Sequence, residues 1–541
     1  MSRWLKYPII TLAFGAIIFV CLWWYYTKKP LDITSENEIH IALENDIQTL
    51  DPVFLTDPYT SRIIWQIYEG LIGLDASGNL IPLIAESWDA SDNFKTWRFK
   101  IRDNIRFHKY DCFPEPNKTR NVTAQDVVFS YTRFAGALGS FIFTGLIEGF
   151  DSYIAKKSDQ ISGFKALDDH TFEIRLTRPE PAFLYRLTSP FLSIMPEEAV
   201  NLGVEKFGKN IAVGTGPFRL VHRTDTEVEL EKNPEYWKAS AGNIERVFFR
   251  VIKNPQFRVG EFKNGNLDII LLPTNMIPYF IDDGIQLKDK YAKKYEVSLQ
   301  STYNIHFIGV NNEILNDTNL RRAIAFAIDS NIIISTILNG SAIQADSPVF
   351  PSMLGYQSPA FIEHDMERAK EELEKSNYSG GPLKLLIHDA SNSEAVGQIV
   401  QSQLDKVGIN VSLEKVDFNT ALNRVFTGNT PELFSMFFEW IYGAPELLFD
   451  VYRSRKIPSP NVASYVDPLV DSLIENAICE SRREEINQNL FQAEEIASES
   501  APYIWLYHAQ NILLHKNTYS NVAINPHNHW LISEITVKER K

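Results

Sequence analysis

Strand-like and helix-like segments alternate along almost the whole chain, and neither a low-complexity linker nor a repeat of fixed period interrupts them. Glu38 to Ala42 is strand-like, Ser61 to Leu71 has the apolar spacing of an amphipathic helix, and Thr96 to Ile101 is strand-like again. This alternation predicts an α/β protein. Because no flexible tether is present, we expect the domain boundaries in short connections that contain Gly and Pro, such as residues 210–218 and 271–278.

Two helices are predicted from local signals. Thr123 and Asp126 have the spacing of a capping box, in which each side chain satisfies an amide of the first turn, so a helix should begin at Thr123. A longer helix is predicted from Asn319 to about Leu338, because apolar side chains recur there on one stripe. Both helices are interpreted as structural.

The N-terminus has the pattern of an export signal. Arg3 and Lys6 precede an apolar stretch of 18 residues from Ile9 to Tyr26, and two lysines follow it. This length approaches the roughly 20 residues that a helix needs to cross a bilayer, so residues 1–30 are predicted to be an uncleaved anchor. No other stretch has spanning length, and the chain is therefore not predicted to be a transporter itself.

Lipidation of Cys21 is the alternative interpretation of the same segment. Lipoprotein signals normally place a small residue before the cysteine and a polar tether after it, whereas Val20 precedes Cys21 here and bulky residues 22–25 follow it. Both interpretations predict an extracytoplasmic protein, in a periplasm or at the cell surface, that is tethered to the cytoplasmic membrane.

Size, charge and cysteine content narrow the class of protein. A chain of 541 residues with 44% hydrophobic residues can bury several cores, so two or three domains are expected. The formal net charge of -15, without clustered Lys and Arg, argues against nucleic-acid binding. Cys112 and Cys479 are the only cysteines besides Cys21, which predicts free thiols, although a bridge between these two stays open.

The sequence contains no constellation that would activate a nucleophile, hold a metal or bind a cofactor. Residues 203–210 have the spacing of a phosphate-binding loop, but Asn210 stands where a magnesium-binding hydroxyl is needed. His527 and His529 are spaced as metal ligands can be, yet without further ligands a solvated loop is favoured. We therefore expect a binding protein rather than an enzyme, with no cofactor.

Five strings in order resemble the large solute-binding proteins of oligopeptide, dipeptide and nickel ABC importers, extracytoplasmic solute-binding protein family 5. The resemblance covers nearly the whole chain beyond residue 36. The strings are LIPLIAESWDASDNFKTWRFKIRDNIRFH from Leu80, NVTAQDVVFS from Asn121, NIAVGTGPFRLVHRTDTEVELEKNPEYW from Asn210, NLRRAIAFAIDS from Asn319 and QLDKVGINV from Gln403.

The resemblance implies a two-lobed periplasmic-binding-protein-like (Venus flytrap) fold of the large three-domain type. A ligand would be buried between the lobes when they rotate together about hinge strands near residues 302 and 508. The implied division of the chain is 1–30 for the signal or anchor, 36–80, 210–302 and 508–541 for lobe I, 81–209 for a domain inserted in lobe I, and 303–507 for lobe II.

The same resemblance implies a function. The protein would be the substrate-binding protein of an ABC importer, monomeric apart from its anchor, that captures oligopeptide-like ligands and delivers them to the permease subunits. Peptides bound by relatives lie extended and pair through their backbones, with side chains in hydrated pockets. Two alternatives stay open: the same fold could bind a metal complex, a murein fragment or a modified peptide, or the anchored protein could be a scaffold or signalling protein.

Ligand-contacting residues are carried over position by position from the family. The loop after Leu50 resembles a ligand-binding segment, although Pro58 in that loop lacks the amide hydrogen for one usual contact. The predicted set comprises Thr56, Asp57 and Pro58 in this loop, Phe141 and Phe143 in the inserted domain, Asn304 on the crossover strand, and Trp440, Tyr442, Gly443 and Glu446 in the second lobe.

Gly443 is the most informative departure from the family. Peptide-binding relatives have an aspartate three residues after the tryptophan that corresponds to Trp440, and it pairs with the amino terminus of the ligand; here that position is Gly443. Burying an ammonium group without a partner costs several kcal/mol. Either Glu446, Glu439 or Asp57 replaces the aspartate, or the ligand has no free amine.

Overall fold

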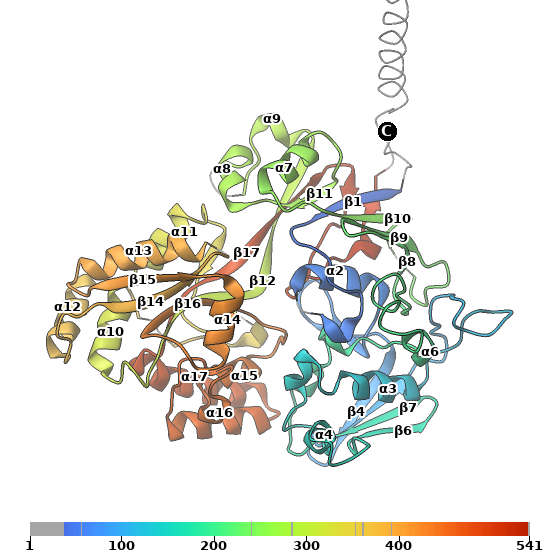
Figure 1. Ribbon diagram of the computed structural model, residues 1–541, viewed down its shortest axis with the longest axis horizontal. Helices are drawn as coiled ribbons and strands as arrows, with labels where there is room; N and C mark the ends of the chain where they lie inside the picture. Colours follow the sequence, from blue (N-terminus) through green and yellow to red (C-terminus); the bar gives the residue numbers. More distant parts are fainter. Residues whose placement is uncertain are drawn as a thin grey trace, which may run out of the picture.

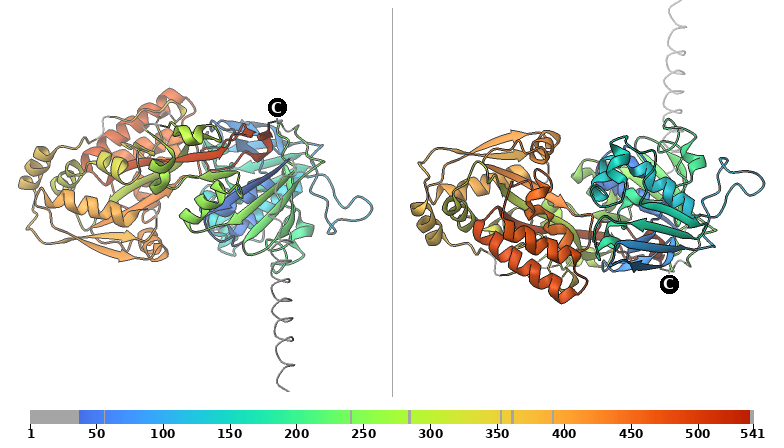
Figure 2. Two further views of the ribbon diagram at one scale, coloured as in Figure 1. Left: turned by 90° about the horizontal axis from the view of Figure 1, so that it is seen from above. Right: turned by 90° about the horizontal axis from the view of Figure 1, so that it is seen from below.

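The computed structural model describes residues 37–538, apart from residues 56, 240, 283–284, 352, 360–361 and 391. The predicted anchor, Cys21 and Thr56 lie outside the described residues. The described chain forms two lobes joined by two long strands (Figure 1), and the perpendicular views show the same two bodies (Figure 2). Every helix in this part of the chain is too short or too polar to traverse a bilayer. The predicted two-lobed α/β fold is confirmed.

The first lobe contains one end of the main sheet, in the order β11-β1-β10-β9-β8. β1 runs parallel to β10 and β11, and its last five residues are buried because it lies between neighbours on both sides. The strands are β1 (Glu38–Leu43), β8 (Phe218–Arg223), β9 (Glu227–Lys232), β10 (Arg246–Val251) and β11 (Ile269–Leu271). The helices are α2 (Pro58–Ile67), α7 (Pro255–Lys263), α8 (Ile277–Phe280) and α9 (Asp289–Ala292).

A separate antiparallel sheet, in the order β4-β5-β7-β6, forms the lower part of the same lobe in Figure 1. The main-chain amide of Thr123 donates to the Asp126 carboxylate over 2.8 Å, so the predicted capping box opens the adjacent helix α3. The strands of this sheet are β4 (Ala85–Ser91), β5 (Thr96–Ile101), β6 (Phe164–Asp168) and β7 (Thr171–Arg175). β2 (Ile72–Leu74) and β3 (Leu80–Pro82) form a two-stranded sheet of their own. The helices are α3 (Ala124–Phe134), α4 (Phe150–Ile154), α5 (Phe183–Arg186) and α6 (Glu197–Val200).

The second lobe carries the other end of the main sheet, in the order β15-β14-β16-β12, with β14 parallel to both of its neighbours. Its strands are β13 (Ala342–Gln344), β14 (Leu383–His388), β15 (Val411–Val416) and β16 (Leu433–Glu439). Its helices are α10 (Thr318–Ala327), α11 (Ser330–Thr336), α12 (Met366–Lys375), α13 (Ser393–Asp405), α14 (Phe418–Phe426), α15 (Pro445–Leu448), α16 (Pro468–Cys479) and α17 (Arg483–Ser500).

The single helix predicted from Asn319 to about Leu338 is wrong, because the chain forms α10 and α11 instead. Ile328 and Asp329 adopt extended backbone angles between them, and the Asp329 carboxylate accepts the amide of Asn331 over 3.0 Å as the cap of α11. An aspartate inside a periodic apolar pattern can therefore end one helix and begin another. Both Cys112 and Cys479 are free thiols, so they do not form a bridge in this structure.

Two long strands, β12 (Tyr295–Val310) and β17 (Tyr503–Lys516), pair antiparallel and run from one lobe into the other. Their register shifts between Ser301 and Ile305, where the ladder is interrupted. In this interruption the amide of Tyr303 donates to Pro526 of the first lobe over 3.0 Å, and its carbonyl accepts the amide of Trp440 of the second lobe over 2.8 Å. One residue of the crossing strand thus binds both lobes.

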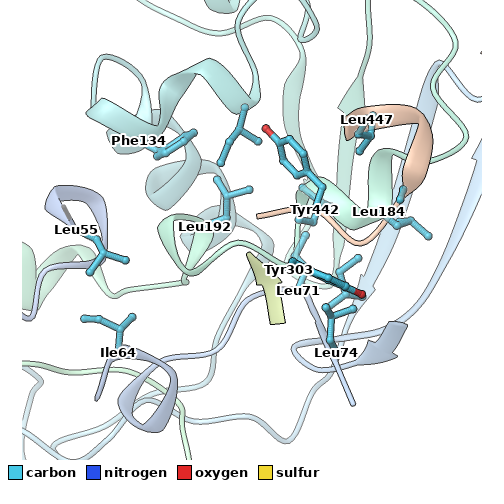
Figure 3. Close-up of a cluster of buried hydrophobic side chains, with 14 of the residues drawn as sticks. Leu55, Ile64, Leu71, Leu74, Phe134, Leu184, Leu192, Tyr303, Tyr442 and Leu447 are labelled. Carbon is cyan, nitrogen blue, oxygen red and sulfur yellow. The ribbon is translucent and has the colours of Figure 1, made fainter. Parts of the chain in front are cut away.

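The lobes are in contact beyond the crossing strands. One cluster of buried hydrophobic side chains includes Leu184 of the first lobe and Tyr442 and Leu447 of the second (Figure 3). The ring of Tyr442 also lies 5.0 Å from the guanidinium carbon of Arg186, at the end of α5. Apolar surface is therefore buried between the lobes in this arrangement. The last strands, β18 (Tyr519–Ser520) and β19 (Thr536–Val537), form a small hairpin near the C-terminus.

Candidate functional site

A pocket of about 170 Å³ lies between the lobes, at the end of β16. Asp57, Ser61 and Trp65 recur every four residues, so α2 places them on one face, toward this pocket. Its walls are Leu55, Asp57, Ser61 and Trp65 around α2, Pro190 and Phe191 after α5, Glu439 at the end of β16 with Trp440 and Ile441 after it, and His527 near the C-terminus. We call this space the cleft pocket.

A larger hollow of about 510 Å³ lies at Gly443, at the other end of the short segment that begins at Trp440. It is lined by Tyr303, Gly443 and the loop at Gly78, among others, so it too joins both lobes and the crossing strand. Pockets for small ligands usually measure about 300–1,000 Å³. The loop after β16 thus borders both the cleft pocket and this hollow.

Glu439 provides the most unusual charge in the cleft pocket. Loss of hydration raises the pKa of its carboxyl to about 6, which Arg62 opposes and the charge of Asp57 reinforces. Its carboxylate makes no hydrogen bond and no ion pair with any residue that the structure describes. Glu439 is therefore an acceptor group that the protein itself leaves without a donor.

The neighbouring charges leave this part of the cleft acidic. Arg62 is bound to Glu44 over 2.7 Å, so one guanidinium is shared among three nearby carboxylates. The Asp57 carboxylate accepts the amides of Tyr59 and Thr60 over 2.9 and 2.8 Å, which holds it at the start of α2. The negative charges of Asp57 and Glu439 are therefore not neutralised by a cation of their own.

Asn304 adds a third acceptor to this group. It lies directly opposite Glu439 in the ladder between β12 and β16, and cross-strand partners project from the same face of a sheet. The Oδ1 atom of Asn304 is buried and has no hydrogen-bond partner among the described residues. Glu439 and Asp57 line the cleft pocket as oxygen acceptors suited to a cationic donor such as an ammonium group, and Asn304 lies beside Glu439 on the sheet.

Trp440 and Gly443 frame the segment between the two spaces. The Trp440 indole donates to the carbonyl of Pro348 over 3.1 Å and packs against Phe438 at 4.8 Å, which fixes the ring as part of the cleft wall. A Cβ atom added to Gly443 would lie 3.2 Å from atoms of both Tyr185 and Tyr303. Gly443 thus allows a close approach between the lobes.

Three predicted site residues have other contacts in this structure. Glu446 is 1% exposed and Arg483 holds both of its oxygens, over 2.8 and 3.2 Å, so it is not a free partner for an ammonium group. Phe143 is fully buried among aromatic rings of the first lobe, including Tyr131. Tyr442 packs against Arg186 between the lobes. The assignment of these three residues to the ligand site stays a prediction.

The remaining predicted residues are less constrained by the structure. Phe141 is 56% exposed on a short 3-10 helix of the inserted domain and does not line the cleft pocket. Pro58 is the first residue of α2. Thr56 lies outside the described residues.

Sequence reasoning missed Trp65, Phe191 and His527, which line the cleft pocket. The four-residue spacing from Asp57 to Trp65 is a signal that could have identified the tryptophan. The histidine segment predicted as a solvated loop instead packs against the cleft wall, with His529 stacked on Trp65 at 4.8 Å. No local pattern marks Phe191. Among the described residues, no group of three His, Cys, Asp or Glu side chains is arranged to hold a metal ion.

Two α/β lobes, a pair of crossing strands and a pocket between the lobes define a two-lobed solute-binding protein. The family model for bacterial extracellular solute-binding proteins, family 5 (middle), matches residues 79–457. The chain therefore belongs to family 5 of the bacterial extracellular solute-binding proteins, a family of binding proteins that act outside the cytoplasm. The recognition from sequence is confirmed.

Curated relatives match over most of their length. The periplasmic oligopeptide-binding protein OppA of Salmonella typhimurium is 28% identical over 499 residues, which cover 87% of each chain. The probable D,D-dipeptide-binding periplasmic protein DdpA of Escherichia coli is 28% identical over 501 residues, 89% of this chain and 90% of the relative.

Solved structures share the fold. HbpA2 from Haemophilus parasuis superposes with a TM-score of 0.77 at 22% identity, over 93% of this chain and all of that one. The murein tripeptide binding protein MppA of Escherichia coli gives the same TM-score and identity, over 94% of this chain and 99% of the other.

Proposed function

We propose that this protein captures peptides with a free amino terminus between its lobes and delivers them to the permease of an ABC importer. The observation that carries the proposal is the unpaired carboxylate of Glu439, which faces the cleft pocket beside Asp57 and opposite Asn304. The names of curated relatives, which include oligopeptide-binding and di/tripeptide-binding proteins, support the same class of ligand.

Glu439 replaces the missing aspartate in this proposal. Position 443 is a glycine, and Glu446 is occupied by Arg483. An ammonium group in the cleft pocket would gain the charges of Glu439 and Asp57. It would supply the Glu439 carboxylate with the donor that the described residues do not provide.

The peptide backbone would lie extended along the segment after β16. The segment borders the cleft pocket at Trp440 and the hollow at Gly443, so successive side chains of an extended peptide could enter the two spaces. We propose that closure turns about Tyr303, where the ladder of β12 and β17 is interrupted, which agrees with the hinge expected near residues 302 and 508. The predicted domain boundaries remain part of this proposal.

Delivery requires that the loaded protein meets a membrane permease. We propose that residues 1–30 tether a monomer to the cytoplasmic membrane, either as an uncleaved helix or through a lipid on Cys21. The helical anchor and the lipid anchor can be distinguished by fractionation. Membrane and soluble fractions are separated from cells that express either the wild type or Cys21→Ala. The variant stays in the membrane fraction if the helix is the anchor and is released if the lipid is; release of the wild type itself would refute tethering.

The ligand class is tested by native mass spectrometry of the protein purified from its host without refolding. The expected result is a series of bound masses that fragment as peptides with free amino termini. A single bound mass without peptide fragments would overturn the peptide proposal in favour of a different solute. An empty protein that also fails to bind tri-alanine would overturn it as well.

A further inference from the structure

A chamber of about 90 Å³ lies inside the first lobe, directly behind the cleft pocket. We call it the rear chamber; its boundary includes Trp65, Glu69, Ser189, His527 and Trp530. Trp65 and His527 line both the chamber and the cleft pocket, so these two side chains form the wall between them. A cavity needs a volume of only about 10–15 Å³ to hold one water molecule. The rear chamber can therefore hold a group of several heavy atoms.

Four residues of this boundary have a buried polar atom without a hydrogen-bond partner among the described residues: Tyr68 Oη, Ser189 Oγ, His527 Nε2 and Trp530 Nε1. Ser189 and Trp530 are only 3% and 1% exposed, so bulk water does not reach them. Leaving a buried polar group unpaired costs about 1–3 kcal/mol. The indole of Trp530 can only donate, so its partner must present an acceptor such as a carbonyl oxygen.

Glu69 determines which charges the rear chamber tolerates. Its carboxylate accepts hydrogen bonds from Tyr236 Oη over 2.7 Å, from Thr215 Oγ1 over 2.8 Å, and from Trp237 Nε1 over 3.2 and 3.1 Å to its two oxygens. These contacts occupy the roughly four lone-pair positions of a carboxylate. Glu69 therefore has no free lone pair to accept a hydrogen bond from an incoming ammonium or guanidinium group. Its negative charge also repels an incoming carboxylate.

Burial raises the pKa of Glu69 to about 7, and of the other titratable groups near the rear chamber Lys238 opposes this shift. Burial lowers the pKa of both His527 and His529 to about 3, so both imidazoles are neutral at physiological pH. Lys238 lies at the boundary, but its ammonium is 46% exposed and lies 3.7 Å from Glu534. The rear chamber thus lacks both a free cation for an acid and a free anion for a base.

We propose that the rear chamber is a subsite for a short, uncharged side chain of the ligand that carries a carbonyl oxygen, namely a carboxamide such as that of asparagine. Trp530 Nε1 donates to the carbonyl oxygen, and Ser189 Oγ and His527 Nε2 pair with the amide group. The side chain enters from the cleft pocket when the rings of His527 and Trp65 move apart. This inference rests on the proposed peptide-binding function.

The test compares tri-alanine with tripeptides in which asparagine, aspartate, leucine or lysine replaces each alanine in turn, by titration calorimetry. At one of the three peptide positions, the tripeptide with asparagine is expected to bind at least ten-fold more tightly than those with aspartate, leucine or lysine. Tri-alanine reports peptide binding by itself, so the two proposals fail separately. Binding of tri-alanine without any preference for asparagine overturns the subsite alone, whereas no binding of any peptide overturns both.

Trp530→Phe is the closest variant, because it keeps an aromatic ring and removes the N–H donor together with the second ring of the indole. The variant is expected to lose the preference for asparagine while its affinity for tri-alanine stays close to wild type, and its melting temperature should fall because the smaller ring leaves a void. A preference that survives in Trp530→Phe would overturn the role of the indole. Should that variant fold poorly, crystals of the wild type soaked with acetamide decide: acetamide hydrogen-bonded to Trp530 supports the subsite, and water only overturns it.

Discussion

Asn304 and Glu439 lie opposite each other at the last pair of the ladder between β12 and β16, where the crossing strand meets the cleft pocket. Neither Asn304 Oδ1 nor the Glu439 carboxylate has a donor among the described residues. A single donor that bound both side chains would also bridge β12, which joins the lobes, and β16.

Replacing Glu439 with glutamine should weaken binding of tri-alanine by about 2–3 kcal/mol, or about 30- to 150-fold, because the ammonium group loses its main charge partner. Titration calorimetry measures the change. N-acetyl-tri-alanine is the matched ligand control and should bind the wild type and Glu439→Gln with similar affinity. An equal loss for both ligands would show that Glu439 supports the structure rather than the amine.

Binding of free-amine peptides should weaken in acid. The pKa of Glu439 in the empty cleft is about 6, and the ammonium group binds the ionised carboxylate. Affinity should therefore be constant above about pH 7 and fall by about ten-fold per pH unit below pH 6, as the carboxylate takes up a proton. Calorimetry from pH 4.5 to 8 measures this profile. Glu439→Gln should give a flat profile; a similar slope in both proteins would assign the effect to another group.

Gly443→Asp should not improve binding of tri-alanine, although it restores the carboxylate that peptide-binding relatives have. Glu439 already supplies a charge, and the new Cβ atom would lie 3.2 Å from Tyr185 and Tyr303, which must shift. We expect the affinity to stay equal or fall by up to about ten-fold. Gly443→Ala separates the effect of the Cβ from that of the charge. A clear gain in Gly443→Asp alone would contradict the role of Glu439.

Tyr442→Leu should favour the open state. The ring of Tyr442 in the second lobe lies 5.0 Å from the guanidinium of Arg186 in the first lobe, and such cation–π contacts contribute about 0.5–2 kcal/mol. Ligand dissociation should accelerate by about 3- to 30-fold, and the radius of gyration of the ligand-free protein should increase in solution scattering. Tyr442→Phe keeps the ring but loses the hydroxyl that interacts with Arg186, so it should accelerate dissociation less than Tyr442→Leu does. An unchanged rate of ligand dissociation in Tyr442→Leu would show that this contact does not stabilise the closed state.

Glu494→Gln should make stability less dependent on pH. Burial raises the pKa of Glu494 from 4.5 to about 8, and the side chain is bound to Tyr356 and Ser347. The folded protein thus holds a proton that the unfolded chain releases above pH 4.5, so wild-type stability falls by up to about 1.4 kcal/mol per pH unit between pH 4.5 and 8. Glu494→Gln should lose this slope in urea unfolding. The exposed Glu499→Gln on the same helix should keep it.

Several features of the molecule could be predicted from the sequence because they depend on residues that are close together in the chain. The alternation of apolar patterns predicted the α/β class, and β5 occupies the predicted Thr96–Ile101. The capping-box spacing of Thr123 and Asp126 predicted the start of α3. The prediction failed at Asp329, where a capping contact within two residues outweighed a longer apolar period.

The composition of the site was decided by the tertiary structure. Glu439 and Glu446 are similar in sequence terms, yet Arg483 neutralises one and no described residue pairs with the other. His527 joins the cleft wall through packing against Tyr303, more than 200 positions away in the chain. Charge pairing and burial depend on contacts between distant segments, and a local pattern of residues does not contain them. The sequence alone therefore determined the family and the two lobes, while the three-dimensional packing determined which side chains are free to bind a ligand.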